Sequence, residues 1–256
     1  ASQEACHMRV AIIADIHANL EALEAALIAI EREGIDRIIC LGDIVGYGPD
    51  PLGCIYRLQE VEALVLLGNH DQAIIEPQSI RSFNATARPS LLYACECIGE
   101  EERAYLEGLT LFKEGRDIEA VEGMEEVVFT HANPLNPAEW EPLYLHAKIA
   151  KVMDVLEHKI AFVGHTHYAG IYCKMRARTL PLTSSIVAIG PHQYLVNPGS
   201  IGQPRDGNWR ASYAVWDIEK NGVELHRVEY AVKRTQEKMR ALDFPHFTIE
   251  RLGLGA

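Results

Sequence analysis

The chain has 256 residues, of which 48% are hydrophobic and 23% are charged, and its formal net charge is −12. A chain of this length can bury enough surface to need no disulfide or structural metal for stability. The excess of acid, without a basic tract, argues against a nucleic-acid duplex or an acidic membrane as a partner. No apolar run reaches membrane-spanning length.

The start of the chain and its cysteines indicate its setting. We find no signal peptide, and Met8 looks like the native start, with residues 1–7 added ahead of it. Apart from Cys6, five cysteines remain, an odd number of mostly core-like thiols, which favours a reducing cytoplasm. Cys95 and Cys97 are too closely spaced for a zinc knuckle and lack a second pair, so we expect a reduced pair on a helix.

The first part of the chain alternates between strands and helices. Apolar, β-branched runs predict buried strands at 9–14, 37–41 and 61–67. A helix is predicted to begin after Asn19 as its N-cap and to stop at Gly34, and a second covers about 52–59. This order is typical of a parallel α/β sheet.

Residues 72–110 interrupt that alternation. The sequence predicts a loop first, then helices near 89–98 and 100–109. Two placements are open for this segment: a helical cap over a site, or padding at the edge of the sheet.

Strands dominate the rest of the chain. They are predicted at 117–121, 126–129, 160–163, near 171, near 186, and at 193–196, 211–217 and 223–230. Helices are predicted at 145–157 and 232–242, and the Gly-rich tail 252–256 is predicted to be disordered. Without a repeat or an obvious linker, residues 1–256 are expected to form a single domain.

Five polar strings follow predicted strands and contain five of the eleven histidines. They are Asp15-x-His17, Gly42-Asp43-x-x-Gly46, Gly68-Asn69-His70-Asp71, His131 and Gly164-His165-x-His167. Each string alone is compatible with a turn or a hydrogen-bonded loop histidine, but their joint occurrence favours a metal site. Imidazole and carboxylate ligands suit Mn, Fe, Zn, Ni or Co. If the strand ends converge, the Asp43 carboxylate can touch two cations.

In their order, these strings resemble the calcineurin-like metallophosphoesterase superfamily, and most closely its small bacterial and archaeal phosphodiesterase branch. The match runs from Asp15 to His167, and the strings at 13–19 and 197–200 look like those of that branch. The resemblance implies an α/β fold, a four-layer α-β-β-α sandwich of two mixed sheets with helices outside. It also implies a two-metal site at the carboxyl ends of the strands.

The same resemblance implies which residues hold the metals. Its ligand set is Asp15, His17 and His167 for one metal, Asn69, His131 and His165 for the other, and Asp43 as the bridge. We expect two divalent ions, with Mn favoured over Fe, Zn, Ni or Co. A hydroxide bridging the ions would attack phosphorus in line.

His70 follows Asn69 directly and by resemblance is not a ligand. We expect it to protonate the leaving oxygen or to stabilise phosphoryl charge, and the alternative is a histidine that only orients Asn69. In the serine/threonine phosphatases of the superfamily, an Asp that pairs with this histidine stands where this chain has Gly46. Asp71 could take over part of that role, and the missing Asp favours the phosphodiesterase branch.

Two further residues have open roles. Arg205 could bind a substrate phosphate in two-point fashion, or it could be a surface arginine. Tyr47 could line the pocket or support it from behind.

The favoured hypothesis is a metal-dependent hydrolase of phosphodiesters or small phosphate compounds. A dinucleoside polyphosphate hydrolase or a protein phosphatase on the same machinery is an alternative, and so is a catalytically silent binding scaffold of the same fold. The scaffold is disfavoured because every ligand position is filled. We expect a small phosphate-containing substrate as partner, whereas the sequence leaves its identity and the oligomeric state open.

Overall fold

The computed structural model describes residues 8–118, 123–176, 178–182 and 184–256. The assignment of residues 1–7 as an addition to the native chain therefore lies outside the described residues. So does most of the strand predicted at 117–121. Its first residue, Asp117, ends a 3-10 helix, η2 (Gly115–Asp117).

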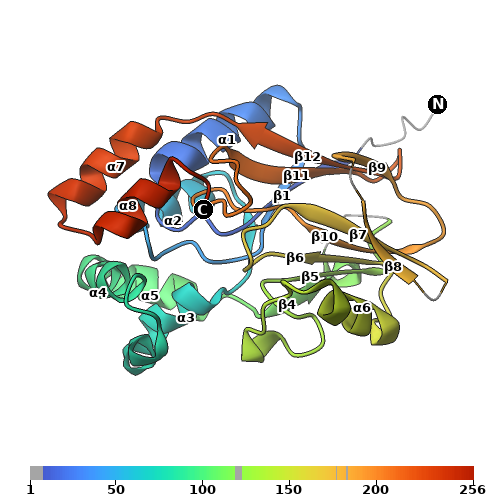
Figure 1. The fold of residues 1–256 in the computed structure, drawn as a ribbon, viewed down its shortest axis with the longest axis horizontal. Coiled ribbons are helices and arrows are strands. Elements are labelled where there is room, and N and C mark those ends of the chain that lie inside the picture. Colours follow the sequence, from blue (N-terminus) through green and yellow to red (C-terminus); the bar gives the residue numbers. More distant parts are fainter. Residues whose placement is uncertain (1–7, 119–122, 177, 183) are drawn as a thin grey trace.

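Within the described residues, two mixed sheets of six strands each lie face to face (Figure 1). The first sheet has the order β3 (Leu64–Val65), β2 (Arg37–Cys40), β1 (Arg9–Ile13), β11 (Ala211–Asp217), β12 (Gly222–Val228), β9 (Ile186–Ala188). The second has the order β4 (Phe112–Glu114), β5 (Val127–Thr130), β6 (Ile160–Val163), β10 (Gln193–Asn197), β7 (Gly170–Met175), β8 (Arg178–Leu182).

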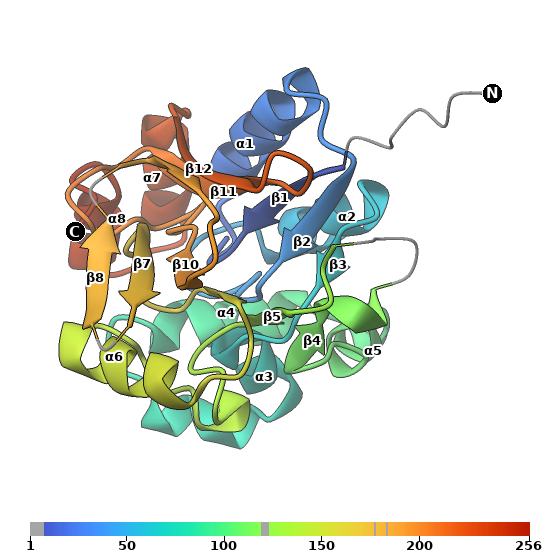
Figure 2. The ribbon, with the colours of Figure 1, turned by 90° about the vertical axis from the view of Figure 1, so that its right-hand side faces the viewer.

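Helices cover the outer faces of both sheets (Figure 2). The helices that share an apolar core with the first sheet are α1 (Leu20–Arg32), α2 (Pro51–Glu60), α3 (Asn69–Ile75), α4 (Arg88–Cys97) and α5 (Glu100–Glu107). The second sheet is covered by α6 (His146–Val155). The C-terminal helices α7 (Val232–Ala241) and α8 (His246–Leu252) pack on each other, and α7 packs on α1. Two more 3-10 helices are η1 (Pro77–Ser82) and η3 (Pro137–Glu139).

The strand β1 shows why the layers form. Its side chains alternate between two faces, as in any strand. Ala11 and Ile13 pack in the core under the helices, whereas Val10 and Ile12 pack in the core between the sheets. A strand that is apolar on both faces must be covered on both, and this requirement produces the layered sandwich. The predicted α-β-β-α arrangement of two mixed sheets is confirmed.

Most predicted elements are present, with shifted ends. Asn19 caps α1 as predicted, because its Oδ1 accepts a hydrogen bond from the backbone N–H of Ala22 at 3.2 Å. The third strand, predicted at 61–67, is limited to Leu64–Val65.

The loop predicted to start at residue 72 is wrong, because α3 runs from Asn69 to Ile75 and η1 follows it. These pieces are too short to show a hydrophobic period, so local hydrogen bonds decide their conformation. The segment 72–110 packs beside the first sheet through α3, α4 and α5, with Leu66 bridged to Thr110 at the edge of that sheet.

The C-terminal end also differs from the prediction. Helix α8 was not predicted, and the tail 252–256 is packed rather than disordered. The carbonyl of Gly255 accepts a hydrogen bond from the N–H of Gly207 at 2.8 Å, and Leu252 is buried. A glycine-rich composition does not reveal such a tertiary contact.

Two other observations concern the whole described chain. No helix within it is long and apolar enough to span a membrane. Its cysteines Cys40, Cys54, Cys95, Cys97 and Cys173 are free thiols, and Cys95 and Cys97 lie on α4 as predicted.

Candidate metal centre

Two sets of parallel strand ends meet at one edge of the sandwich. In the first sheet β1, β2 and β3 run parallel and lead to Asp15, Asp43 and Asn69. In the second sheet β5 and β6 run parallel and lead to His131 and His165. The Asp15 carboxylate accepts a hydrogen bond from the backbone N–H of His165 at 3.0 Å, which ties the two sheets together. The convergence that the sequence predicted is therefore present.

The first group of side chains contains Asp15, His17 and His167, all buried. The Nε2 atoms of His17 and His167 lie 3.0 Å apart. His167 Nε2 is 3.3 Å from Asp15 Oδ1, and His17 Nε2 is 3.6 Å from Asp43 Oδ2. Their ligand atoms are close enough to surround one ion.

The second group surrounds His131 Nε2. This atom is 3.3 Å from Asp43 Oδ2, 3.2 Å from Asn69 Oδ1 and 3.1 Å from His165 Nδ1. Asp43 Oδ2 is thus close to both groups, as a bridging carboxylate must be. All seven predicted ligands lie in these two groups.

Backbone carbonyls orient three of the imidazoles. The Nδ1 atoms of His17, His131 and His167 contact the carbonyl oxygens of Val45, Leu41 and Gln203 at 3.1, 3.1 and 2.6 Å, respectively. A carbonyl oxygen can only accept, so each Nδ1 carries the proton and, in the neutral ring, Nε2 carries a lone pair.

As a result, hydrogen-bond acceptor atoms of neighbouring side chains face each other inside the site. With this tautomer, two lone pairs meet between His17 Nε2 and His167 Nε2, and His131 Nε2 meets the amide oxygen of Asn69. With the rings neutral, neither contact is a hydrogen bond, and buried acceptors without a donor are costly. A divalent cation between them would satisfy every lone pair, so this donor set fits the two ions that the sequence predicts.

Burial keeps most of these imidazoles neutral. It lowers the pKa of His17 and of His167 well below the usual range. Burial and the neighbouring His131 lower the pKa of His165 to about 3. The neutral imidazole is the form that binds a metal.

His131 and Asp43 form the exception. Burial acts to lower the pKa of His131, but the Asp43 carboxylate outweighs it and raises that pKa to about 9. Burial acts in turn to raise the pKa of Asp43, but His131 holds it well below the usual range. Without metal, a second proton on His131, at Nε2, is the positive charge that compensates the buried carboxylate, and a cation bound there would take the place of that proton.

Five predicted ligands have left-handed backbones. Their φ angles are 53° for Asp15, 50° for His17, 57° for Asp43, 66° for His165 and 62° for His167. Such conformations are uncommon outside glycine, although Asp and His tolerate them better than most residues. They persist where the surroundings hold them, and they concentrate at functional sites.

His70 lies beside the Asp43 carboxylate. Its backbone N–H donates to Asp43 Oδ1 at 2.8 Å, and its ring contacts Tyr47 and Phe83 with centroids 4.8 and 5.0 Å away. A Cβ atom at Gly46 would lie 2.2 Å from His70 Nδ1. The position of Gly46 is therefore filled by the histidine ring itself, which leaves no room there for an Asp.

The idea that Asp71 takes over from the missing Asp is wrong. Its carboxylate accepts backbone N–H groups at 2.8–3.2 Å, those of Asp43, Ile44, Val45 and Gly68. Among the described residues, His70 Nδ1 has no hydrogen-bond partner. Burial and the nearby Asp43 raise the pKa of Asp71 to about 7. Asp71 holds the loop that carries Asp43 rather than the histidine.

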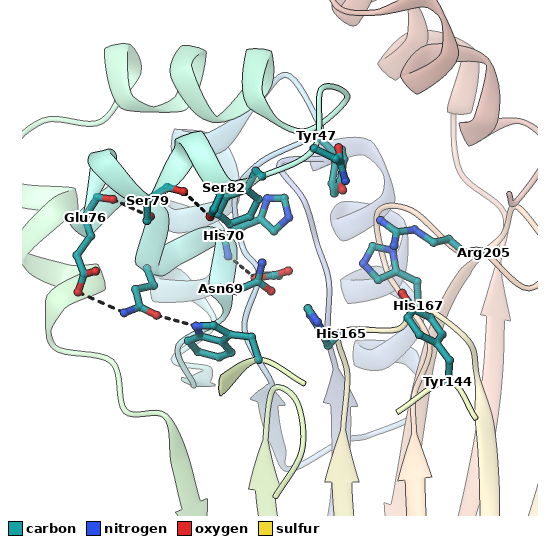
Figure 3. Close-up of a pocket in the computed structure, with 15 residues that line it drawn as sticks. Tyr47, Asn69, His70, Glu76, Ser79, Ser82, Tyr144, His165, His167 and Arg205 are labelled. Atoms are coloured by element: carbon teal, nitrogen blue, oxygen red, sulfur yellow. Dashed lines mark hydrogen bonds between the residues drawn. The ribbon is translucent and has the colours of Figure 1, made fainter. Parts of the chain in front are cut away.

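A pocket of about 550 Å³ opens over this site (Figure 3). Arg205, Tyr144 and His167 line one side, and His70, Ser79, Ser82 and Glu76 line the other, with Asn69 and His165 between them. Tyr47 lines this pocket and is also buried in the core under the helices, so both of its expected placements are confirmed.

Arg205 lies in the pocket rather than on the open surface. Its guanidinium stacks 5.5 Å from the centre of the Tyr47 ring and donates to Gln203 Oε1 at 2.9 Å. Its Nε is buried and has no hydrogen-bond partner within the described chain. Gln203, which also orients His167, was not singled out from the sequence, although it lies two residues before Arg205.

Comparisons with known proteins agree with this geometry. Residues 8–221 match the model of the calcineurin-like phosphoesterase superfamily domain. An uncharacterized protein of Methanocaldococcus jannaschii is 38% identical over 247 residues, which cover 96% of this chain and 98% of that protein.

Two solved structures are similar in fold and sequence. A metallophosphoesterase of Sphaerobacter thermophilus superposes with a TM-score of 0.82 and 34% identity, covering 98% of this chain and 100% of that chain. A hypothetical protein of Pyrococcus horikoshii OT3 superposes with a TM-score of 0.77 and 25% identity, covering 97% of this chain and 99% of that chain. The family resemblance inferred from the motifs is confirmed, and the chain belongs to the calcineurin-like phosphoesterase superfamily.

Proposed function

We propose that this chain is a two-metal phosphoesterase that hydrolyses phosphodiesters or small phosphate compounds, with Mn as the favoured metal. One observation carries the proposal: seven side chains from two sheets converge in two groups that share Asp43, with acceptors facing acceptors. Membership of a phosphoesterase family supports the same reaction class.

In this proposal Asp15, His17 and His167 hold one ion, Asn69, His131 and His165 hold the other, and Asp43 bridges them. When bound, two such cations supply a water of lowered pKa and neutralise phosphoryl oxygens. The chain itself fixes the ligands: the carbonyls of Leu41, Val45 and Gln203 set the tautomers of His131, His17 and His167.

His70 would act on the phosphoryl group or on the leaving oxygen. It is buried, lines the pocket and lies close enough to His17 and Asp43 for their ligand atoms to form a group. Its Nδ1 is buried against Gly46 and has no hydrogen-bond partner among the described residues, so Nε2 is the nitrogen that would act on a substrate. A positioned histidine of this kind contributes general acid catalysis.

Arg205 would bind a non-bridging phosphoryl oxygen. Its guanidinium is held by Tyr47 and Gln203, whereas its buried Nε has no acceptor in the described protein. A fixed cation at the pocket also offsets, for an anionic substrate, the net charge of −12.

The test is metal analysis of protein purified without chelators, combined with assays of bis-p-nitrophenyl phosphate, p-nitrophenyl phosphate and diadenosine tetraphosphate with Mn²⁺. We expect two divalent ions per chain and fastest hydrolysis of the diester. Faster hydrolysis of the tetraphosphate would favour a dinucleoside polyphosphate hydrolase. Absence of turnover with every divalent metal would overturn the proposal in favour of a binding scaffold.

A further inference from the structure

The wall of the pocket opposite Arg205 differs from it in chemistry. It consists of the C-terminal end of α3, η1 and the residues that follow, together with Trp140. The charged residue on this wall is Glu76, whereas Arg205 on the other side attracts the phosphoryl group of a substrate. A further negative charge on that substrate would be repelled by Glu76. We call Glu76, Ser79, Ser82 and Trp140 the acceptor wall.

Hydrogen-bond acceptors are concentrated on the acceptor wall. The Ser79 hydroxyl donates to the carbonyl of Glu76 at 2.7 Å, and the Ser82 hydroxyl donates to the carbonyl of Ser79 at 2.7 Å. Because both protons are already used, each Oγ can offer a bound molecule only its lone pairs. The Glu76 carboxylate is likewise an acceptor, and Figure 3 shows all three residues on one side of the pocket.

The pocket is also rich in flat apolar surface. Four of its fifteen lining residues are aromatic, namely Tyr47, Phe83, Trp140 and Tyr144, whereas aromatic residues make up 7% of the chain. Tyr47 and Phe83 pack against His70. Trp140 instead lies edge-on to His131, with ring centroids 5.8 Å apart, and Tyr144 lies edge-on to Tyr168 at 6.0 Å.

Trp140 is fixed in an unusual conformation. Its backbone is left-handed, with φ 52° and ψ 32°, which is an outlier for so bulky a residue. Its indole N–H donates to Gln72 Oε1 at 2.8 Å, and Gln72 Nε2 donates to Glu76 Oε1 at 3.2 Å. One chain of hydrogen bonds thus positions both the ring and the carboxylate of the acceptor wall.

We propose that the acceptor wall binds the organic group of the substrate, and that this group is a planar ring that bears N–H or O–H donors and no negative charge, as in a nucleoside. The ring would stack on Trp140, and its donors would bond to Glu76 and the serines. The proposal rests on the proposed function, because it places the phosphoryl group at the metals and Arg205.

The test compares two esters with the same leaving group, p-nitrophenyl thymidine 5′-phosphate and methyl p-nitrophenyl phosphate, both with Mn²⁺. We expect the wild-type kcat/KM to favour the nucleoside ester by about tenfold or more, the usual scale of base stacking on an aromatic residue. Trp140→Ala should bring the ratio close to one, whereas Trp140→Phe, which keeps a ring, should retain most of it. Phe112→Ala, which removes an exposed aromatic ring outside the pocket, should leave the ratio unchanged.

A second pair of variants tests the charge of the wall and does not depend on the folding of Trp140→Ala. Glu76 is exposed, so Glu76→Lys and Glu76→Gln are expected to fold. The wild type should hydrolyse the 3′-phosphorylated nucleoside ester less efficiently than the unmodified one. Glu76→Lys should reverse this preference, and Glu76→Gln should reduce it.

Each outcome bears on a distinct claim. Equal kcat/KM for the methyl and nucleoside esters in the wild type, or a ratio that survives Trp140→Ala in folded protein, would overturn this inference and leave the phosphoesterase intact. A wild type that prefers the 3′-phosphorylated ester would overturn the assigned charge of the substrate group. No hydrolysis of either ester would overturn the proposed function, and this inference with it.

Discussion

At the scale of single residues, Gly46 and His70 occupy one shared space. Gly46 has φ +83°, and any Cβ there would collide with the imidazole of His70. The glycine is thus required twice, by its backbone conformation and by the ring that packs against it. Its effect is to let His70 lie beside Asp43 without a carboxylate on its Nδ1.

Gly46→Ala should reduce both stability and turnover, because its methyl group must displace His70. Gly207→Ala is the matched control, since Gly207 has a similar φ of +80° and nothing within 4 Å of its Cβ position. We expect Gly46→Ala to cost about 1–3 kcal/mol more in unfolding free energy than Gly207→Ala, measured by urea denaturation. Equal costs would show that His70 does not occupy this space.

His70→Asn should keep the metal content and lose about 100-fold or more of kcat, as expected when a general acid is removed. Metal analysis and steady-state kinetics on the same preparation measure the two quantities. His246→Asn, at a side chain that is 87% exposed, is the control and should change neither. Unchanged turnover in His70→Asn would remove the catalytic assignment, and lost metal would favour a role in orienting Asn69.

At the scale of elements, Asp71 joins helix α3 to the loop that carries Asp43. It lies in the first turn of α3 and accepts the N–H of Gly68, which caps the helix. It also accepts N–H groups of the loop, including that of Asp43 itself. One buried side chain therefore fixes the position of Asp43 and of the helix that begins with Asn69.

Asp71→Asn should destabilise the protein by about 2 kcal/mol, because an amide replaces one oxygen and turns a donor toward backbone donors. Weaker metal binding should accompany this loss, since the ligand loop is released. Urea denaturation and Mn²⁺ titration measure the two effects. The control is Asp36→Asn, because the exposed Asp36 carboxylate accepts a single backbone N–H, that of Arg9. This change should lower the free energy of unfolding much less than Asp71→Asn does.

At the scale of the whole molecule, the candidate metal centre lies between the two sheets. Its predicted ligands follow β1, β2 and β3 in one sheet and β5 and β6 in the other. Bound ions would therefore stabilise the packing of one sheet on the other, because they bind only the folded arrangement.

Chelation should lower the midpoint of thermal unfolding, and added Mn²⁺ should restore it. At a free metal concentration of about 100 times Kd, linkage predicts about 2.7 kcal/mol of stabilisation per site. Asp43→Asn, which weakens the shared ligand, should lose most of this response in the same calorimetric experiment. A midpoint that is indifferent to both chelator and Mn²⁺ would contradict a metal centre between the sheets.

The chelated protein should lose stability as the pH falls from 7 to 5. The folded-state pKa values of His17 and His167 lie well below 6.5, and that of His165 is about 3, so these three groups bind more protons in the unfolded chain than in the folded one. Asp71, with a folded-state pKa of about 7, acts in the opposite direction, but it is one group against three. His131, with a folded-state pKa of about 9, stabilises the folded protein fully below about pH 6.5. This stabilisation is lost only as the pH rises toward 9, so it does not change between pH 7 and 5 in the direction of a loss. Urea denaturation in chelator at pH 7, 6 and 5 checks this, and a constant unfolding free energy would refute it.

The sequence alone was sufficient for the sheets and for the side chains at their edge. Apolar runs such as 160–163 can only be buried strands here, and polar residues directly after them must lie at the sheet rim. Strand direction brings Asp15 and Asp43 to one edge of the first sheet and His131 and His165 to one edge of the second, because parallel strands end at the same edge. That the two edges face each other was implied by the family resemblance and depends on how the sheets pack.

Tertiary structure alone decided how the site is held and what surrounds it. Three features of the site depend on contacts between distant segments. Asp71 accepts four backbone N–H groups, the His70 ring packs where a side chain at Gly46 would lie, and Trp140 lines the pocket. The same holds for the packed tail at Gly255. Hydrophobic periodicity encodes which face of an element is buried, but short helices, loops and pocket walls have no period. Their conformation is set by hydrogen bonds and packing that exist only after the sheets have come together.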